Sequence, residues 1–359
     1  MSPVEMSPVG RRSVELSLVV VAFDMADQLA NTVESLARQE GLGPGRIELI
    51  LVDNGSNPGV DDALTAAFGG ESRVLKIEDA GVSPASGVNR GIAASTGRHV
   101  GLIVDGARMA SPGLCGWALR GLNLASRCVV TAPAFLLGAD GADGADGAAG
   151  GAGGGGADGA AGGGGADGDR RGTTGRGGTP AARTPDADAE LLDRIDWRSD
   201  PRRLFGASRL APSSGRGLFG PMGESSSLFM ARELWDELGG VDEGFASPGG
   251  GLMNHDLYLR ACALPESELV VLLGEGTFHQ AHGGVASSAP GDARSAFKAE
   301  YERLRGRSHR PPTRAPVYLG TVPREFLVHV EHSLERAASK VRYDPMPVVA
   351  APLPSEAQR

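Results

Sequence analysis

Short apolar runs alternate with amphipathic stretches along the first third of the chain, a pattern typical of repeated strand–helix units. Residues 16–22 form a β-branched apolar run that predicts a buried strand, and residues 26–39 place apolar side chains at helical spacing. Dense turn signals separate the successive segments. The same alternation predicts further strands at 47–52, 73–77 and 99–104, and helices at 61–68, 86–96 and 111–125.

Repeated units of this kind predict an α/β fold, in which a mostly parallel sheet is covered by helices on both faces. Ligands of such sheets bind beyond the carboxyl ends of the strands. Polar and aromatic residues directly follow three of the predicted strands, so we expect them to converge on one rim. These residues are Phe23, Asp24, Asp53, Asn54 and Asp105.

A low-complexity segment interrupts the pattern. Residues 138–169 comprise 16 Gly, 10 Ala and 6 Asp and nothing else. No side chain here is larger than a carboxylate, so burial cannot offset the entropy of ordering the segment. We therefore predict a disordered insertion over residues 137–186. Beyond it, order is expected to resume near 187–197, with strands at 226–230 and 269–273 and helices at 231–238, 293–305 and 323–339.

Charge and cysteine usage narrow the class of protein. Without the six Asp of residues 138–169, the formal charge of −9 becomes −3, which argues against nucleic-acid binding through global positive charge. Three widely spaced cysteines predict neither a disulfide framework nor a thiolate zinc site. No apolar run approaches the roughly 20 residues of a membrane span, and the N-terminal residues lack a signal peptide's apolar core. We therefore expect a soluble, cytoplasmic protein, with peripheral membrane association left open.

Six pieces of the sequence, in this order, resemble the family 2 glycosyltransferases, which use nucleotide-diphosphate sugars. They cover roughly residues 16–285 and fall at the strand and helix boundaries that such a fold requires. The pieces are VVVAFDMADQLANTVESL (19–36), ELILVDNGS (48–56), SGVNRGIAASTG (86–97), VGLIVDGA (100–107), LGGVDEGF (238–245) and NHDLYLRA (254–261).

The resemblance implies a GT-A fold and a transferase that moves a sugar from a UDP- or GDP-type donor to a glycan or other hydroxyl acceptor, with inversion. The alternative is an inactive binding or scaffold module. The implied organisation is a tail (1–15), a nucleotide-sugar-binding half (16–136), the insertion (137–186), an acceptor and catalytic half (187–290) and a helical extension (291–359).

The resemblance also implies which residues hold the donor. Asp53, with Asn54 beside it, maps to the acid that binds the base, and a carboxylate can accept a ring N–H of uracil or guanine. The alternative for Asp53 is an Asx turn that caps the strand. Phe23 and Asp24 would lie beside the base and ribose, or serve only helix entry and packing. Asn89 would sit on a helix that approaches the nucleotide, or be an ordinary polar helix residue.

The metal motif of the family, Asp-x-Asp, is incomplete in this chain. Asp105 is followed by Gly106 and Ala107, so the second carboxylate is absent. The resemblance implies a histidine from the C-terminal half at the metal, and His279 and His282 follow a predicted strand. A carboxylate with imidazoles suits Mn²⁺, whereas Mg²⁺ prefers more oxygen ligands. Metal-free stabilisation by Arg108 is the alternative, as is loop hydrogen bonding by the histidines.

The resemblance places the catalytic base at Asp256, in the piece that begins a helix. A carboxylate base is needed because an alcohol becomes a competent nucleophile only as its proton leaves. The alternative is that Asp256 caps the helix dipole. Asn254, two residues earlier, stands where an acid would be expected.

The composition of the insertion leads to a direct test. Replacement of residues 138–182 by a short Gly/Ser loop is expected to leave folding intact, because the segment offers no side chains to pack. The melting temperature of the shortened protein, measured beside the full chain, checks this. A loss of several degrees would mean that the segment contributes to the folded structure.

Overall fold

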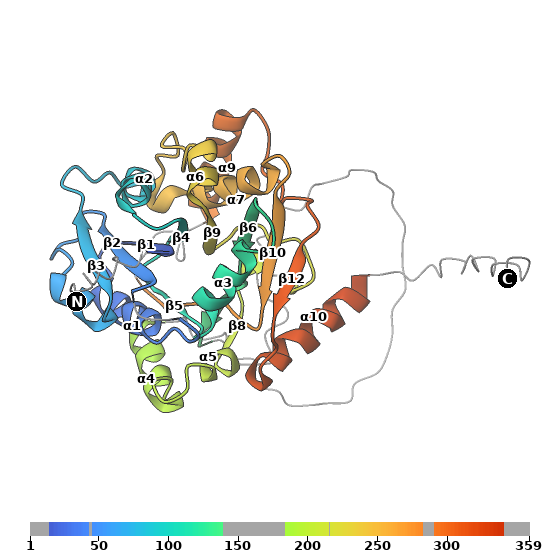
Figure 1. The fold of residues 1–359 in the computed structure, drawn as a ribbon. Helices are drawn as coiled ribbons and strands as arrows, with labels where there is room; N and C mark the ends of the chain where they lie inside the picture. Colours follow the sequence, from blue (N-terminus) through green and yellow to red (C-terminus); the bar gives the residue numbers. More distant parts are fainter. Residues whose placement is uncertain (1–13, 43–44, 139–183, 215, 283–290, 341–359) are drawn as a thin grey trace, which may run out of the picture.

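The computed structural model describes residues 14–42, 45–138, 184–214, 216–282 and 291–340. An eight-stranded sheet runs through these residues in the order β12-β10-β6-β9-β4-β1-β2-β3 (Figure 1). Every pairing in it is parallel except those that β9 makes with β4 and β6. The strands are β1 (Leu16–Ala22), β2 (Ile47–Asp53), β3 (Glu71–Lys76), β4 (His99–Ile103), β6 (Cys128–Thr131), β9 (Ser227–Ala231), β10 (Glu268–Leu273) and β12 (Val317–Gly320).

Both faces of the sheet are buried. Along β1, Leu18 and Val20 face one layer of the core, whereas Val19 and Val21 face the other. The first layer is covered by α1 (Ala26–Ala37) and α3 (Leu114–Leu122), and the second by α2 (Ala85–Ala94), α6 (Arg232–Leu238) and α7 (Met253–Ala263). Burial on both sides explains why these strands read as continuous apolar runs. The predicted α/β fold class is confirmed.

Gly91 lets α2 approach the sheet closely. A Cβ at this position would lie 2.5 Å from Val19 Cγ1 and 2.8 Å from Val52 Cγ2, so any larger side chain would push the helix away from the strands.

A second, smaller sheet lies beside the first and has the order β5-β11-β7-β8. Its strands contain three or four residues each, too few to produce a periodic signal, and the sequence did not predict β5, β7, β8 or β11. Phe135 and Phe278 on this sheet pack against Phe205 and Phe326 in a buried aromatic cluster. The strands are β5 (Arg108–Ala110), β7 (Ala134–Leu137), β8 (Ser208–Leu210) and β11 (Thr277–His279).

The C-terminal residues form two helices and one further strand of the main sheet. Helices were expected at 293–305 and 323–339, and the structure has α9 (Gly291–Arg305) and α10 (Leu327–Lys340) there. Between them lies β12, which was not predicted and which pairs with β10 at the edge of the main sheet. The helix α4 (Pro185–Ile195) begins one residue before the expected end of the insertion, most of which lies outside the described residues. No helix in the described part of the chain is both long and apolar enough to cross a bilayer.

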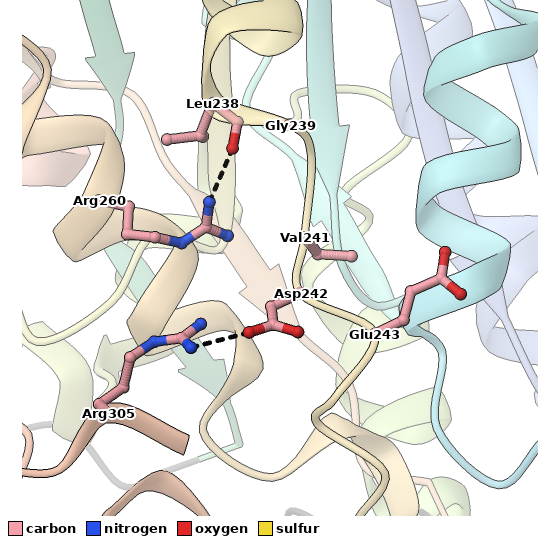
Figure 2. Close-up of a pocket in the computed structure, with 7 residues that line it drawn as sticks. All are labelled: Leu238, Gly239, Val241, Asp242, Glu243, Arg260 and Arg305. Atoms are coloured by element: carbon pink, nitrogen blue, oxygen red, sulfur yellow. Dashed lines mark hydrogen bonds and ion pairs between the residues drawn. The ribbon is translucent and has the colours of Figure 1, made fainter.

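A hollow of about 580 Å³ lies where the α6–α7 connection meets the end of α9 (Figure 2). Two guanidinium groups face each other in it. Arg260 donates to the carbonyl oxygen of Leu238 at 2.9 Å, and Arg305 pairs with Asp242 at 2.7 Å. These contacts lock the connection between the two helices, so the hollow belongs to the scaffold of the fold.

Glu275, in the turn between β10 and β11, is a buried acid that holds the start of α3. Its Oε2 accepts hydrogen bonds from the Ser111 hydroxyl and, at 3.1 Å, from the Gly113 N–H. Burial raises the pKa of Glu275 to about 7, although these hydrogen bonds act in the opposite direction.

The raised pKa of Glu275 predicts a pH-dependent stability. The unfolded state loses this proton near pH 4.5 and the native state near pH 7, so the native state binds more protons in between. The free energy of unfolding should therefore fall by up to about 3 kcal/mol as pH rises through that window. Glu275→Gln should remove this component of the slope, whereas Glu237→Gln, at an exposed position of α6, should retain it. Urea unfolding at pH 4.5, 6 and 7.5 checks this, and equal slopes in all three proteins would contradict it.

Candidate active site

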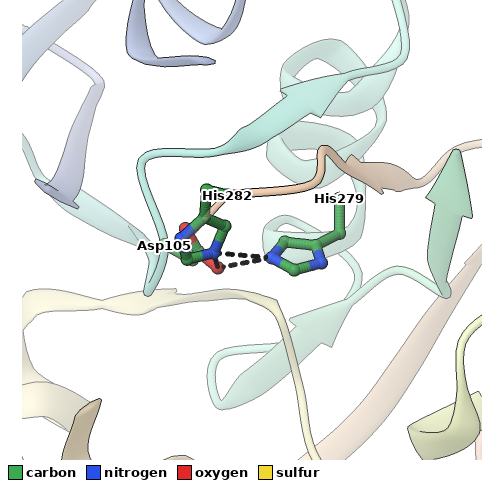
Figure 3. Close-up of side chains that lie close together, drawn as sticks. All are labelled: Asp105, His279 and His282. Carbon is green, nitrogen blue, oxygen red and sulfur yellow. Dashed lines mark hydrogen bonds and ion pairs between the residues drawn. The ribbon is translucent and has the colours of Figure 1, made fainter. Parts of the chain in front are cut away.

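Three potential metal ligands meet at the carboxyl end of β4. Asp105 lies in the turn after this strand, His279 ends β11, and His282 follows three residues later (Figure 3). Asp105 Oδ2 lies 2.9 Å from His279 Nε2 and 3.4 Å from His282 Nε2, and the two imidazole nitrogens are 3.1 Å apart. One ligand atom from each residue lies within 4.8 Å of the others. The structure thus brings together the three residues that were expected to share a cation.

The short strands of the second sheet produce this convergence. Arg108 on β5 pairs in antiparallel register with His279 on β11. The pairing continues through the backbone, where the N–H of Gln280 donates to the carbonyl oxygen of Ala107 at 2.9 Å. Asp105 caps its own turn by accepting from the Ala107 N–H at 2.9 Å. Two segments about 170 residues apart are therefore hydrogen-bonded directly behind the three side chains.

The same turn explains why no second carboxylate follows Asp105. A Cβ on Gly106 would lie 2.8 Å from Ala22 Cβ and 3.1 Å from Met25 Sδ, so the turn needs glycine there. Ala107, at the position of the family's second acid, is fully buried. A carboxylate at this position would point into the protein interior, so the histidines supply the only other candidate ligands found among the described residues.

The loop between the two histidines is fixed from both sides. Gln280 accepts from Asn31 Nδ2 at 2.8 Å and donates to the carbonyl oxygen of Gln28 at 3.0 Å, both on α1. The N–H of Ala281 donates to Asp188 Oδ2 on α4 at 2.5 Å. These contacts hold both imidazoles close to Asp105. A preformed arrangement of this kind reduces the ordering that a ligand must impose.

The electrostatics favour a charged Asp105 beside a neutral His279. Burial would raise the pKa of Asp105, but hydrogen bonds from His279 and His282 and the positive charge of Arg108 hold that pKa well below its usual value. Burial and the charge of Arg108 lower the pKa of His279. An ionised carboxylate with neutral imidazole nitrogens is the state that metal coordination requires.

Arg108 lies beside these ligands. Its Nε is 4.0 Å from Asp105 Oδ2, too far for a hydrogen bond. Both Nε and Nη1 are buried, and neither has a hydrogen-bond partner among the described residues. A buried guanidinium with open donors is costly unless a ligand completes it, and an anion is the group that it would bind.

A second polar cluster, around Glu224, was not predicted from the sequence. Asn254 Nδ2 donates to Glu224 Oε2 at 3.1 Å, and His255 Nδ1 lies 3.4 Å from the same oxygen. The ring of His309 meets the ring of His255 edge-on at 5.1 Å. Glu224 occurs in a Gly/Ser-rich loop just before a predicted strand. An isolated acid in such a loop was the only feature of the sequence that could have indicated this cluster.

The expected nucleotide-binding residues separate into two groups. Phe23 and Asp24 are exposed at the end of β1, and the Phe23 side chain is 54% accessible. Asp24 has a left-handed backbone (φ 48°) and accepts from the Asn57 N–H at 2.7 Å. Asp53 instead is buried, and it organises the loop by accepting from the N–H groups of Ser56 and Val60 at 2.9 and 2.8 Å. The Asx-turn alternative for Asp53 therefore describes its contacts in the structure.

Asn54 and Asn89 do not present free side chains to a nucleotide. Asn54 is buried and donates to the carbonyl oxygen of Gly81 at 3.2 Å. Asn89 bonds both the N–H and the carbonyl oxygen of Val241, and it also donates to Glu243 at 2.8 Å. The Asn89 amide thus connects α2 to the segment that follows α6, and its role in donor binding stays a prediction.

Asp256, predicted as the catalytic base, lies in a closed ion pair in this structure. The residue is 1% exposed, and its carboxylate is enclosed by two guanidinium groups. Arg260 Nε donates to Oδ2 at 2.7 Å, and Arg305 donates to both oxygens at 2.5 and 2.7 Å. A base must reach the proton that it abstracts, and this carboxylate cannot reach a substrate. Asp256 instead joins α7 to α9, next to the hollow lined by the same two arginines.

Comparison with known proteins agrees with the sequence resemblance. Residues 17–106 match the model of a family described as Glycosyl transferase family 2. This match confirms the predicted resemblance over these residues and supports a function in glycosyl transfer. It spans β1 to β4 and the turn that carries Asp105, so it includes the start of the candidate site. Among the curated proteins, none matches this chain.

Several solved structures have a similar arrangement at low sequence identity. S. aureus TarS is 12% identical with a TM-score of 0.43, and the match covers 94% of this chain but only 46% of TarS. A Pyrobaculum calidifontis mannosyltransferase, solved with GDP-Man and Mn²⁺, is 13% identical with a TM-score of 0.43 over 94% of this chain and 77% of that one. Mycobacterium tuberculosis glucosyl-3-phosphoglycerate synthase, solved with Mn²⁺, UDP and glucosyl-3-phosphoglycerate, is 18% identical with a TM-score of 0.42 over 83% and 81%.

The contacts of Asp256 lead to a prediction about stability. Asp256→Asn should lower the free energy of unfolding by roughly 3 kcal/mol, since it leaves two guanidiniums facing a neutral amide. That value is at the low end for a broken buried ion pair, because both arginines keep some contact with solvent. Chemical denaturation against the wild type measures the effect. A variant as stable as the wild type would show that the three-residue contact contributes little.

Proposed function

We propose that this protein transfers a sugar from a nucleotide-diphosphate donor to a hydroxyl group of an acceptor, with inversion at the anomeric carbon. The observation that carries the proposal is the cluster of Asp105, His279 and His282. It lies at the end of a segment that matches a glycosyltransferase family and on the strand edge where ligands of such sheets bind.

The nucleoside would lie at the ends of β1 and β2. Phe23 offers an exposed aromatic face for the base, and Asp24 lies beside it. Asp53 would act by holding the loop of residues 53–60 in shape through its two backbone contacts. This division of roles requires no side chain to leave the partners that it has in the structure.

A divalent cation fits the cluster at Asp105. A carboxylate oxygen and two imidazole nitrogens form a mixed donor set that suits Mn²⁺ better than Mg²⁺. The residues that would hold it are Asp105, His279 and His282. When bound, such an ion neutralises the charge that develops on a diphosphate leaving group.

Arg108 would contribute a second positive charge on the same side of the donor. Its Nε and Nη1 are buried without partners, and a diphosphate oxygen is an acceptor of the right charge for them. Because Arg108 is three residues from Asp105 and paired in register with His279, its position is fixed by the same backbone contacts as the metal ligands.

The proposal predicts cation-dependent donor binding. Calorimetry with UDP-GlcNAc, UDP-glucose and GDP-mannose should detect one preferred donor in the presence of Mn²⁺ and much weaker binding after chelation. Asp105→Asn and His279→Gln should each raise the Mn²⁺ concentration needed for half-maximal binding by at least about tenfold, since even residues behind metal ligands cost that much when changed. Glu237→Gln, far from the cluster on the surface of α6, is the matched control.

Two other results would favour one of the alternative functions. Donor binding that survives chelation but is lost in Arg108→Gln would favour stabilisation by the guanidinium over a metal. Binding with no cleavage of any donor, with or without Mn²⁺, would favour the inactive module, for which the missing second acid after Asp105 is the supporting observation.

A further inference from the structure

Glu224 reaches the same edge of the sheet as Asp105, as the strand register shows. Strand β9 runs antiparallel to β4, and Ser227 lies opposite Ile103. Asp105 comes two residues after Ile103, and Glu224 comes three residues before Ser227. Because the two strands run in opposite directions, both residues extend beyond the same end of the pair. Both acids therefore lie in the loops that leave this end of the β4–β9 pair.

The backbone before β9 is fixed to the strands that carry the candidate site. The hydroxyl of Ser225 lies 2.7 Å from the hydroxyl of Thr131, and that of Ser226 lies 2.7 Å from that of Thr277. Thr277 is on β11, two residues before His279. All four hydroxyl groups are buried, so these contacts define the position of the Glu224 backbone relative to the histidines.

The side chain of Glu224 is held by the start of α7 but remains accessible. Asn254 and His255, in the first turn of this helix, both contact Oε2. The Glu224 side chain is 23% exposed, whereas that of Asp256, directly after His255 in the first turn of α7, is 2% exposed and enclosed by arginines. Burial would raise the pKa of Glu224, but the charges of His255 and Arg108 and two hydrogen bonds bring it below its usual value. The group is therefore an ionised carboxylate at neutral pH.

Arg108 connects Glu224 to the candidate metal ligands. Its charge lowers the pKa values of both Asp105 and Glu224, so the guanidinium lies within electrostatic range of each. An anionic group of a donor bound by Arg108 and the cluster at Asp105 would therefore have Glu224 nearby. Glu224 combines this placement with partial exposure, and no guanidinium is hydrogen-bonded to it among the described residues.

We propose that Glu224 is the catalytic base, a role that rests on the proposed glycosyl transfer. The acceptor oxygen forms a bond to the anomeric carbon while its proton passes to the Glu224 carboxylate. The bond from that carbon to the diphosphate oxygen breaks, and its electron pair leaves with the nucleoside diphosphate. A carboxylate of low pKa suffices, because the acidity of the hydroxyl increases as its oxygen bonds to carbon. Asn254 and His255 orient the carboxylate.

The test uses water and azide in place of the unidentified acceptor. Water must lose a proton when it attacks the sugar, whereas azide is already an anion and needs no base. With Mn²⁺ and the preferred donor, Glu224→Gln and Glu224→Ala should lose hydrolysis by about 10²–10⁴-fold. Added azide should restore donor consumption in Glu224→Ala and yield the glycosyl azide. Donor affinity should stay within about threefold of the wild type, and Glu237→Gln should hydrolyse normally.

The outcomes separate this inference from the proposed function. Hydrolysis by Glu224→Gln within threefold of the wild-type rate would overturn the assignment of the base and leave the transferase proposal standing. Lost hydrolysis together with lost donor binding, and no rescue by azide, would make Glu224 a structural residue and also overturn it. If the wild type neither binds nor cleaves any donor, the proposed function fails first.

Discussion

The antiparallel pairing of β5 with β11 is the contact on which the candidate site depends. It is only three residues long, yet it places Arg108 opposite His279 and joins a turn near residue 105 to a loop near residue 280. Both ends of this short ladder are supported. The buried aromatic cluster around Phe278 packs behind it, and Gln280 and Ala281 are held by α1 and α4. The positions of the ligands are thus determined by backbone hydrogen bonds, which tolerate far less variation than side-chain rotamers.

The main sheet could be predicted from the sequence because its strands are buried on both faces. Runs such as residues 16–22 and 47–52 admit few other interpretations, and helices with one apolar stripe lie between them. The second sheet gave no such signal. Strands of three or four residues, such as β8 and β11, are formed by long-range pairing and do not have a local pattern of their own. For the same reason β12 could not be found within an apparently helical tail.

The candidate site was predicted in part. Asp105, His279 and His282 were grouped because the resemblance implies a histidine from the C-terminal half at the metal, and the structure brings the three together. The contacts of Asn89 and Asp256 could not be predicted, because their partners come from distant segments of the chain. Asn89 contacts Val241 and Glu243, and Asp256 contacts Arg305. Glu224 was missed because its importance comes from the neighbours that the fold brings to it, above all Arg108 and the first turn of α7.

The position of β9 has a consequence for how the chain can be divided. This strand comes late in the sequence, but it lies between β4 and β6, both of which precede residue 138. A piece ending there would expose one edge of β4 and both edges of β6 with unpaired backbone groups, because β10 also follows residue 184. A piece beginning at residue 184 would carry the one strand that fits between them. A break between residues 138 and 184 would interrupt no described strand or helix. The two resulting pieces would be complementary fragments, and reassembly of the sheet could serve as a reporter for bringing two attached proteins together.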